Sequence, residues 1–115
     1  MVESVELAWA AGFFDGEGCI YLHRISGRPC QTRVEISQCG SGVLLRFKDA
    51  LKLGSVTGPY RPSKNGKQEV WKYSAGAIAD VLRIKELLWP YLSSVKKGQF
   101  EKVLSQYERE RSNGN

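Results

Sequence analysis

Two acidic residues stand close together in the segment Asp15-Gly16-Glu17-Gly18. We predict that this segment follows a helix, so Glu17 would lie beside a helix carboxyl terminus, whose partial negative charge disfavours another anion by about 0.3–1 kcal/mol. A divalent cation would relieve this repulsion, because carboxylates and substrate phosphate oxygens are ligands that Mg²⁺ prefers. The segment is therefore a candidate site for metal-assisted phosphodiester hydrolysis. Taken alone, a polar turn that ends a core helix is its commoner explanation.

Hydrophobic periodicity and turn residues predict the elements that would position these acids. We expect helices over residues 5–15, 43–53, 77–89 and 99–109, and strands over residues 19–26, 32–38, 55–60 and 69–74. Gly27-Arg28-Pro29 and Asn65-Gly66 are reversal signals within two hairpins, and Pro90 interrupts the third helix. The predicted order is αββαββα with the last helix following it, and then a disordered tail at residues 112–115.

The fold class predicted from this order is α+β, in one domain over residues 1–111. The chain of 115 residues is too short for two domains with separate cores. Two consecutive hairpins can join into one antiparallel sheet, and helices can cover one of its faces. We therefore expect a β-sheet saddle whose other face is open to solvent or a ligand.

Small side chains form a stripe along one side of the first predicted helix. Ala8, Ala11, Gly12 and Asp15 follow one another at i, i+3, i+4 and i+7, which places them on one face. Such a stripe lets another backbone approach closely, and a second copy of the same helix is the candidate neighbour. In a two-fold dimer, the two Glu17 carboxylates would meet beneath the interface and form one shared site.

Charge and composition narrow the classes of partner and of chemistry. The 17 Lys and Arg against 12 Asp and Glu leave a net charge of +5, which suits a polyanionic partner. The sequence has three cysteines, Cys19, Cys30 and Cys39. An odd number does not suggest a disulfide framework, and their wide spacing does not suggest a zinc site. His23 is the only histidine, which excludes a multi-histidine metal cluster and leaves Ser and Cys nucleophiles without a convincing base.

The location expected for the protein is intracellular. No apolar run approaches the roughly 20 residues of a membrane span, and the amino terminus lacks the basic start of a signal peptide. We expect the cytoplasm of a bacterium or of the host of a virus, or else an organelle.

The nonapeptide Ala10-Ala11-Gly12-Phe13-Phe14-Asp15-Gly16-Glu17-Gly18 resembles the signature of the LAGLIDADG homing endonucleases. Glu replaces the final acid of that signature, and Phe-Phe replaces its central aliphatic pair. The predicted αββαββα order is similar to that of the family over nearly the whole chain. Two segments resemble the family's active-site regions: Val34-Glu35-Ile36-Ser37-Gln38, and Pro90-Tyr91-Leu92 followed by Val95-Lys96-Lys97-Gly98-Gln99.

The resemblance implies roles for individual residues. Glu17 would bind Mg²⁺, a site that Mn²⁺ or Ca²⁺ could also occupy, Lys96 would stabilise developing phosphate charge, and Gln38 would orient a water or a metal-bound ligand. Asp15 would be structural, capping or bonding across the paired helices, with contact to the metal as a secondary alternative. Ser93-Ser94 can add one residue to the basic loop, in which case Lys97 takes the role of Lys96. Without the resemblance, Gln38 is as readily a polar residue that ends a strand, and either lysine a solvated charge.

The open face of the sheet is the predicted DNA-binding surface. If Val34 and Ile36 face the helices, alternation sends their odd-numbered neighbours to the open face. Arginine suits guanine, glutamine suits adenine, and lysine at a hairpin tip suits phosphate. The predicted set, which includes positions of the first strand implied by the resemblance, is Tyr21, His23, Ile25, Arg28, Gln31, Arg33, Glu35, Ser37, Arg61, Lys64, Lys67 and Lys72.

The function implied by the resemblance is that of a single-motif, homodimeric homing endonuclease involved in intron or intein mobility. Such a dimer would hydrolyse both strands of a nearly palindromic duplex across the minor groove at its centre. A DNA-binding regulator that does not cut, or an RNA splicing maturase of the same fold, is the alternative. A ribosomal-type or structural RNA-binding protein is a third class, in which the small-residue stripe would have no purpose.

Overall fold

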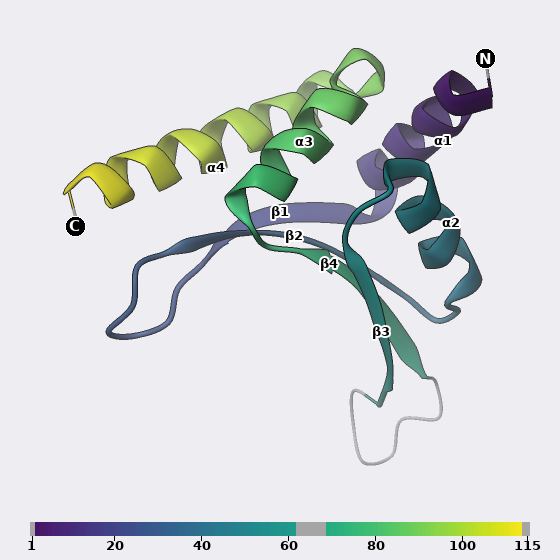
Figure 1. Cartoon of the computed structure of the whole chain (residues 1–115), viewed down its shortest axis with the longest axis horizontal. Coiled ribbons are helices and arrows are strands. Elements are labelled where there is room, and N and C mark those ends of the chain that lie inside the picture. Colours follow the sequence, from purple (N-terminus) through teal and green to yellow (C-terminus); the bar gives the residue numbers. More distant parts are fainter. Residues whose placement is uncertain (1, 62–68, 114–115) are drawn as a thin grey trace.

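The computed structural model describes residues 2–61 and 69–113 (Figure 1). Its helices are α1 (Val2–Glu17), α2 (Gly42–Leu51), α3 (Ile78–Leu88) and α4 (Ser94–Asn113), with the 3-10 helix η1 (Trp89–Tyr91) between the last two. Its strands are β1 (Gly18–His23), β2 (Gln31–Gln38), β3 (Ser55–Tyr60) and β4 (Val70–Ala75). The predicted α+β class and αββαββα order are confirmed, and the expected last helix, α4, follows the break at Pro90.

The four strands form one antiparallel sheet in the order β1-β2-β4-β3. The helices lie over one face of this sheet, and the other face arches over an open concavity between the two hairpins (Figure 1). In the register of the sheet, Ile36 of β2 lies between Gly18 of β1 and Tyr73 of β4. The predicted saddle with one open face is therefore the observed architecture.

Alternation along the strands decides which side chains enter the core. Thr32, Val34 and Ile36 are buried beneath the helices, so the odd-numbered residues of β2 lie on the open face. Aromatic rings fill much of the space between sheet and helices: Phe47 packs edge-on against Tyr73 with ring centroids 4.8 Å apart. The Tyr73 hydroxyl donates a hydrogen bond to a backbone carbonyl oxygen at 2.8 Å, so this buried polar group is satisfied.

The first helix is longer than expected and runs directly into the sheet. It ends at Glu17 rather than at Asp15, and β1 begins at Gly18. A Cβ atom at position 18 would lie 2.1 Å from the buried ring of Phe14, so only glycine fits at this junction. The segment that was expected to be a turn is therefore the last turn of the helix.

The last helix also differs from the prediction at both ends. It begins at Ser94, so the segment expected to be a basic loop lies in its first turns. At the other end it continues to Asn113, which includes two residues of the expected disordered tail. Within the described part of the chain, none of the helices is both long enough and apolar enough to cross a membrane.

Candidate active site and nucleic-acid interface

Glu17 is the last residue of α1, where the helix meets β1, and its side chain is exposed. The buried glycine that follows it fixes the direction of the chain at this point, because Phe14 leaves no room for a side chain there. The carboxylate therefore stands at a rigid junction between helix and sheet rather than on a loose turn.

Asp15 fastens the end of α1 to the start of α4. Its carboxylate oxygens accept hydrogen bonds from the backbone N–H of Ser93 at 3.2 Å and from the Ser93 hydroxyl at 2.9 Å. The Ser93 Oγ atom in turn lies 3.4 Å from the backbone nitrogen of Lys96, in the position of an N-terminal helix cap. These contacts lie within one chain and join α1 to α4, whereas Asp15 was expected to cap or bond across the paired helices of a dimer.

Lys96 reaches back from α4 to the residue that follows Glu17. Its Nζ atom donates to the Gly18 carbonyl oxygen at 2.6 Å, and Gln99 Oε1 lies 3.3 Å from the same nitrogen. The ammonium group also lies 5.5 Å from the centroid of the Phe14 ring. The structure thus brings a positive charge to the helix–sheet junction that carries Glu17.

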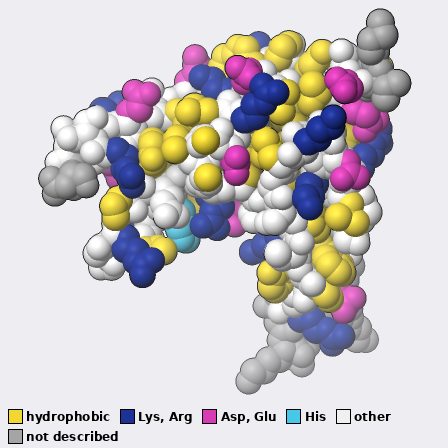
Figure 2. Space-filling model, in the orientation of Figure 1, with side chains coloured by type: hydrophobic (Ala, Val, Ile, Leu, Met, Phe, Trp, Pro, Cys, Tyr) yellow, Lys and Arg dark blue, Asp and Glu magenta, His cyan; other side chains and the backbone are white. Residues whose placement is uncertain are grey.

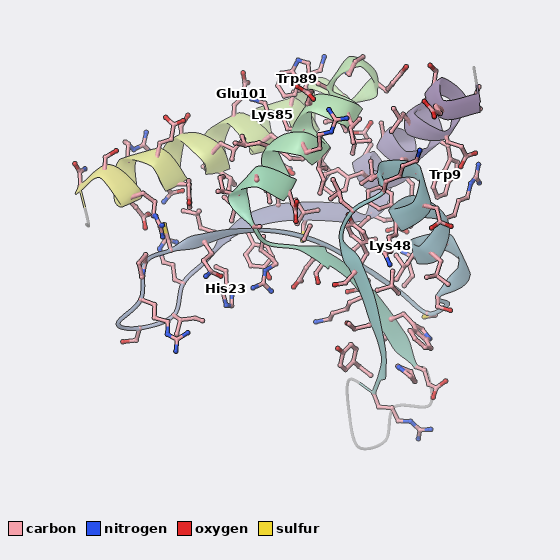
Figure 3. The ribbon with its side chains drawn as sticks, in the orientation of Figure 1. Trp9, His23, Lys48, Lys85, Trp89 and Glu101 are labelled. Carbon is pink, nitrogen blue, oxygen red and sulfur yellow. The ribbon has the colours of Figure 1, made fainter. Side chains whose placement is uncertain are left out.

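Lys97 points elsewhere. Its Nζ atom lies 5.3 Å from the ring centroid of Trp89, and Lys85 approaches the same ring at 4.9 Å. Figure 3 places Trp89 and Lys85 in the helical layer, well away from the open face of the sheet. Of the two lysines considered from sequence, only Lys96 therefore contacts the junction.

Charged groups around this junction shift the pKa values of their neighbours. Burial raises the pKa of the Cys19 thiol, the Glu35 carboxylate raises it further, and Lys96 opposes that rise. Burial and a hydrogen bond with Glu35 also raise the pKa of Tyr21. Cys19 is paired with Glu35 across β1 and β2, so these groups share one neighbourhood on the open face, next to the candidate site.

Gln38 ends β2, two residues beyond the pair formed by Ile36 and Gly18. It is half-buried, it pairs with Trp71 of β4, and alternation places it on the same side as Ile36. The two strands run antiparallel, so a residue of β2 that comes after Ile36 lies beyond Gly18 on the side of α1. Gln38 is therefore near the carboxyl end of α1. The structure places Gln38 in the region of the junction without giving it a contact with Glu17 or Lys96.

A single chain offers an incomplete set of metal ligands at this junction. Among residues 2–61 and 69–113, no group of three or more His, Cys, Asp and Glu side chains is arranged to hold a metal ion. Glu17 supplies one exposed, hard oxygen ligand, whereas Asp15 is engaged with Ser93. Mg²⁺ is commonly held by one or two carboxylates plus substrate phosphates, so Glu17 fits such a site as a contributor rather than as a complete cage.

The open face carries the strand residues that were predicted to bind DNA. Cross-strand pairs join Tyr21 to Arg33 and His23 to Gln31, and Ser37 pairs with Lys72. His23 lies beneath the sheet in Figure 3, and Lys and Arg side chains gather along the same lower edge in Figure 2, on both hairpins and between them.

The remaining predicted DNA-binding residues lie on the connections. Ile25 and Arg28 are exposed in the loop between β1 and β2, and Arg61 follows β3 and pairs with Glu69 at 4.0 Å. Lys64 and Lys67 lie outside the described residues.

Sequence reasoning missed several polar residues of the open face. In one row across the sheet, the predicted Glu35 lies with Cys19, Ser74 and Ser55, which were missed, and Thr57, also missed, lies beside Lys72. The alternation in Ser55-Val56-Thr57 and Lys72-Tyr73-Ser74 was the available signal, because Val56 and Tyr73 pair on the covered face. These side chains add small hydrogen-bonding groups between the charged ones.

The outward stripe of α1 differs from the predicted one. Ala11 is fully buried by its own chain, because both Ala10 and Ala11 pack into the core, so it cannot face a partner helix. The exposed small residues are instead Ala8, Gly12 and Gly16, spaced four residues apart. Beyond its sequence neighbours and the backbone of α1 itself, a Cβ atom at either glycine would have no described atom of this chain within 4 Å.

Comparison with known proteins supports the fold. No protein-family model and no curated protein matches the sequence. Among solved structures, the homing endonuclease I-CvuI in complex with DNA has a TM-score of 0.74 and 23% identity, covering 92% of this chain and 68% of its own. The archaeal intron-encoded homing endonuclease I-Vdi141I, complexed with DNA, has a TM-score of 0.75 and 19% identity, covering 92% and 69%.

A third structure matches less of its own length. The LAGLIDADG meganuclease I-AabMI, bound to uncleaved DNA, has a TM-score of 0.69 and 25% identity, covering 93% of this chain but 38% of its own. The chain therefore has the fold of the LAGLIDADG homing endonucleases, as the sequence resemblance implied.

Proposed function

We propose that the chain is a site-specific, metal-dependent endonuclease that cuts double-stranded DNA as a homodimer. The observation that carries this proposal is the hydrogen bond from Lys96 to Gly18, the residue next to the exposed acid Glu17, at a helix–sheet junction beside an open polar face. The fold adds support, because homing endonucleases of this fold have been crystallised on DNA, in one case in the presence of Mg²⁺ with the DNA not cleaved.

DNA recognition would use the open face. Side chains two residues apart on one face of a strand are about 6.6–6.8 Å apart. This spacing is close to that of two nucleotides along one DNA strand, at 3.4 Å each, so successive odd-numbered residues of β2 can reach alternate base steps. Arg33 and Glu35 are suited to guanine and cytosine edges, respectively, and the basic hairpin residues to phosphates.

Dimerisation would use the stripe of Ala8, Gly12 and Gly16 on α1. The folded chain itself gives no steric reason for glycine at positions 12 and 16, whereas a closely packed partner helix would. A two-fold axis beside this stripe would bring the two Glu17 carboxylates together. The same axis would present identical sheet faces to two half-sites, so the target would be nearly palindromic.

In catalysis, Glu17 from each chain would hold Mg²⁺ together with phosphate oxygens of the substrate. When bound, the ion would supply an acidified water and polarise the scissile phosphate. Lys96 would exchange its hydrogen bond with the Gly18 carbonyl oxygen for one with a phosphate oxygen and stabilise the negative charge that develops there. Gln38 would orient a water molecule from the end of β2.

The test is selection of DNA from a random duplex pool in the presence of Mg²⁺. Recovery of cut fragments that share one nearly palindromic sequence would support the proposal. Duplexes that are retarded on a gel but never cut would identify a DNA-binding regulator instead. Selective binding of RNA under the same conditions would favour the maturase alternative.

A further inference from the structure

The loop at residues 24–30, here called the tip loop, joins β1 to β2 and reaches beyond the sheet (Figure 1). The backbone N–H of Arg28 donates to the Ile25 carbonyl oxygen at 3.0 Å, and Gly27 has a φ of +80°, so the loop bends through a tight turn. Such a turn shapes the loop but does not orient it relative to the sheet. Its orientation depends on what holds its two ends.

The carboxyl end of α4 holds both ends of the tip loop. Arg24, at the start of the loop, forms an ion pair with Glu110. Arg111 Nη1 donates to the backbone carbonyl oxygen of Cys30, at the end of the loop, at 3.3 Å. Continuing the pairing of His23 with Gln31 by one residue places Arg24 opposite Cys30 on the helix-covered side, directly under α4.

The pKa shifts of Glu110 and Cys30 indicate that these side chains interact in one cluster. The hydrogen bond from Arg24 is the main cause that lowers the pKa of the Glu110 carboxyl. Burial raises the pKa of the Cys30 thiol, and its hydrogen bond with Glu110 raises it further. Glu110 thus interacts with both ends of the loop, and Arg111 adds a second bond to one of them.

The exposed residues of the tip loop belong to the open side of the saddle, whereas α4 belongs to the helical layer (Figure 1). Ile25 is 45% exposed and Arg28 is exposed, and both lie between β1 and β2, whose odd-numbered residues face the concavity. On the basis of the proposed function, we propose that Glu110 and Arg111 are positioning residues that orient the tip loop on DNA and thereby determine recognition of the outer base pairs of each half-site.

The location of the expected effect on DNA follows from the length of β1. Six residues from Gly18 to His23, at about 3.4 Å each, place the tip loop about 20 Å from the helix–sheet junction. At 3.4 Å per nucleotide, this distance corresponds to about six base-pair steps. Weakening the hold on the loop should therefore alter preferences about six steps from the cut and leave the central bases unaffected.

The first experiment needs no DNA and measures amide hydrogen exchange at residues 25–28 in the full chain. Glu110→Gln removes the charge that holds Arg24, and exchange should become about two- to fivefold faster at low salt, the range expected for an exposed ion pair. Glu108→Gln is the matched control, because it makes the same charge change at an exposed position of α4. Equal exchange in Glu110→Gln, Glu108→Gln and the parent protein would overturn the proposal.

The second experiment measures recognition of the duplex that the parent protein selects from a random pool, with EDTA present to stop hydrolysis. Each base pair is substituted in turn. Glu110→Gln should weaken discrimination at the outer positions by about two- to fivefold, and the exchanged pair Arg24→Glu with Glu110→Arg should restore it.

An unchanged profile, or a uniform loss at every position, would overturn the positioning role. Selection of no duplex by the parent protein would instead refute the proposed function and with it the DNA role of the loop. The exchange experiment would still decide whether α4 holds the loop.

Discussion

Lys96 and Lys97 are neighbours in sequence, but their ammonium groups have different surroundings. Lys96 donates to the Gly18 carbonyl oxygen beside Glu17, whereas Lys97 lies over the ring of Trp89. A positive group that stabilises charge only in the transition state typically contributes about 10²–10³-fold to the rate. The two positions should therefore respond very differently to the same substitution.

We expect Lys96→Met to lower the single-turnover cleavage rate of the selected duplex by about 10²–10³-fold, because it removes a donor to the developing phosphate charge. Lys97→Met is the matched control and should leave the rate within a few-fold of the parent rate. Binding affinity in EDTA is measured in parallel, to separate lost chemistry from lost phosphate attraction. A larger loss in Lys97→Met than in Lys96→Met would reverse the assignment.

Glu17→Gln should abolish cleavage while leaving DNA binding largely intact. The amide keeps the size of the side chain but loses the charge that a divalent cation requires, and Glu17 is exposed, so folding should be unaffected. Cleavage in Mg²⁺ and gel retardation in EDTA are the two measurements. Glu101→Gln, at an exposed position of α4, controls for the change in net charge. Cleavage retained at the parent rate would refute the mechanism.

The helices and strands were largely predictable because their patterns are local, whereas the carboxyl end of α1 and both ends of α4 were not. The core positions Phe14, Phe47 and Phe100 all follow helical spacing in the sequence. The start of α4, in contrast, depends on the bonds between Asp15 and Ser93, which are 78 residues apart. No local pattern contains such a contact, so the first turns of α4 were expected to be a loop.

The candidate site was predictable only through family resemblance. Composition and spacing pointed to Glu17 as an acid that could hold a metal, but taken alone a polar turn that ends a helix was its commoner explanation. The bond from Lys96 to Gly18, the residue after Glu17, could not be derived from sequence alone, because it depends on how α4 packs against β1. The burial of Ala11 was also not predictable. Helical spacing had placed this residue in the dimer interface, but the side of α1 that packs into the core is wide enough to include it.

Gly12→Ala should have opposite effects on two properties: it should stabilise the folded chain and weaken the association of two chains. Within the chain a methyl group at this position meets no atom within 4 Å, so the substitution should stabilise the helix by about 0.5–1 kcal/mol. In a closely packed dimer the same methyl group would meet the facing helix, and overpacking of this kind costs about 1–3 kcal/mol. The apparent dissociation constant of the dimer should therefore rise about tenfold.

Sedimentation velocity across a range of concentrations measures this association, and urea unfolding at one low concentration measures stability. Ser105→Ala, at an exposed position of α4, is the control for a small change on a helix surface. If Gly12→Ala sediments as the parent does at every concentration, α1 does not form the interface.

The distribution of charge over the whole molecule gives a salt dependence that can be measured. Each chain carries a net charge of +5, so a homodimer would carry +10, and its Lys and Arg side chains are present on both hairpins (Figure 2). Each phosphate that the protein neutralises on duplex DNA contributes about −0.9 to the slope of the logarithm of affinity against the logarithm of salt concentration. The slope thus counts phosphate contacts without requiring their identity.

Arg28→Gln should reduce the magnitude of this slope by about 1.8 in a homodimer, because the substitution removes one phosphate contact from each chain. Arg83→Gln is the control: Arg83 pairs with Glu86 on α3, in the helical layer, and its loss should leave the slope unchanged although the net charge falls equally. Affinity for the selected duplex is measured in EDTA from 50 to 200 mM salt. Equal changes in both variants would mean that net charge alone, rather than the open face of the sheet, attracts DNA.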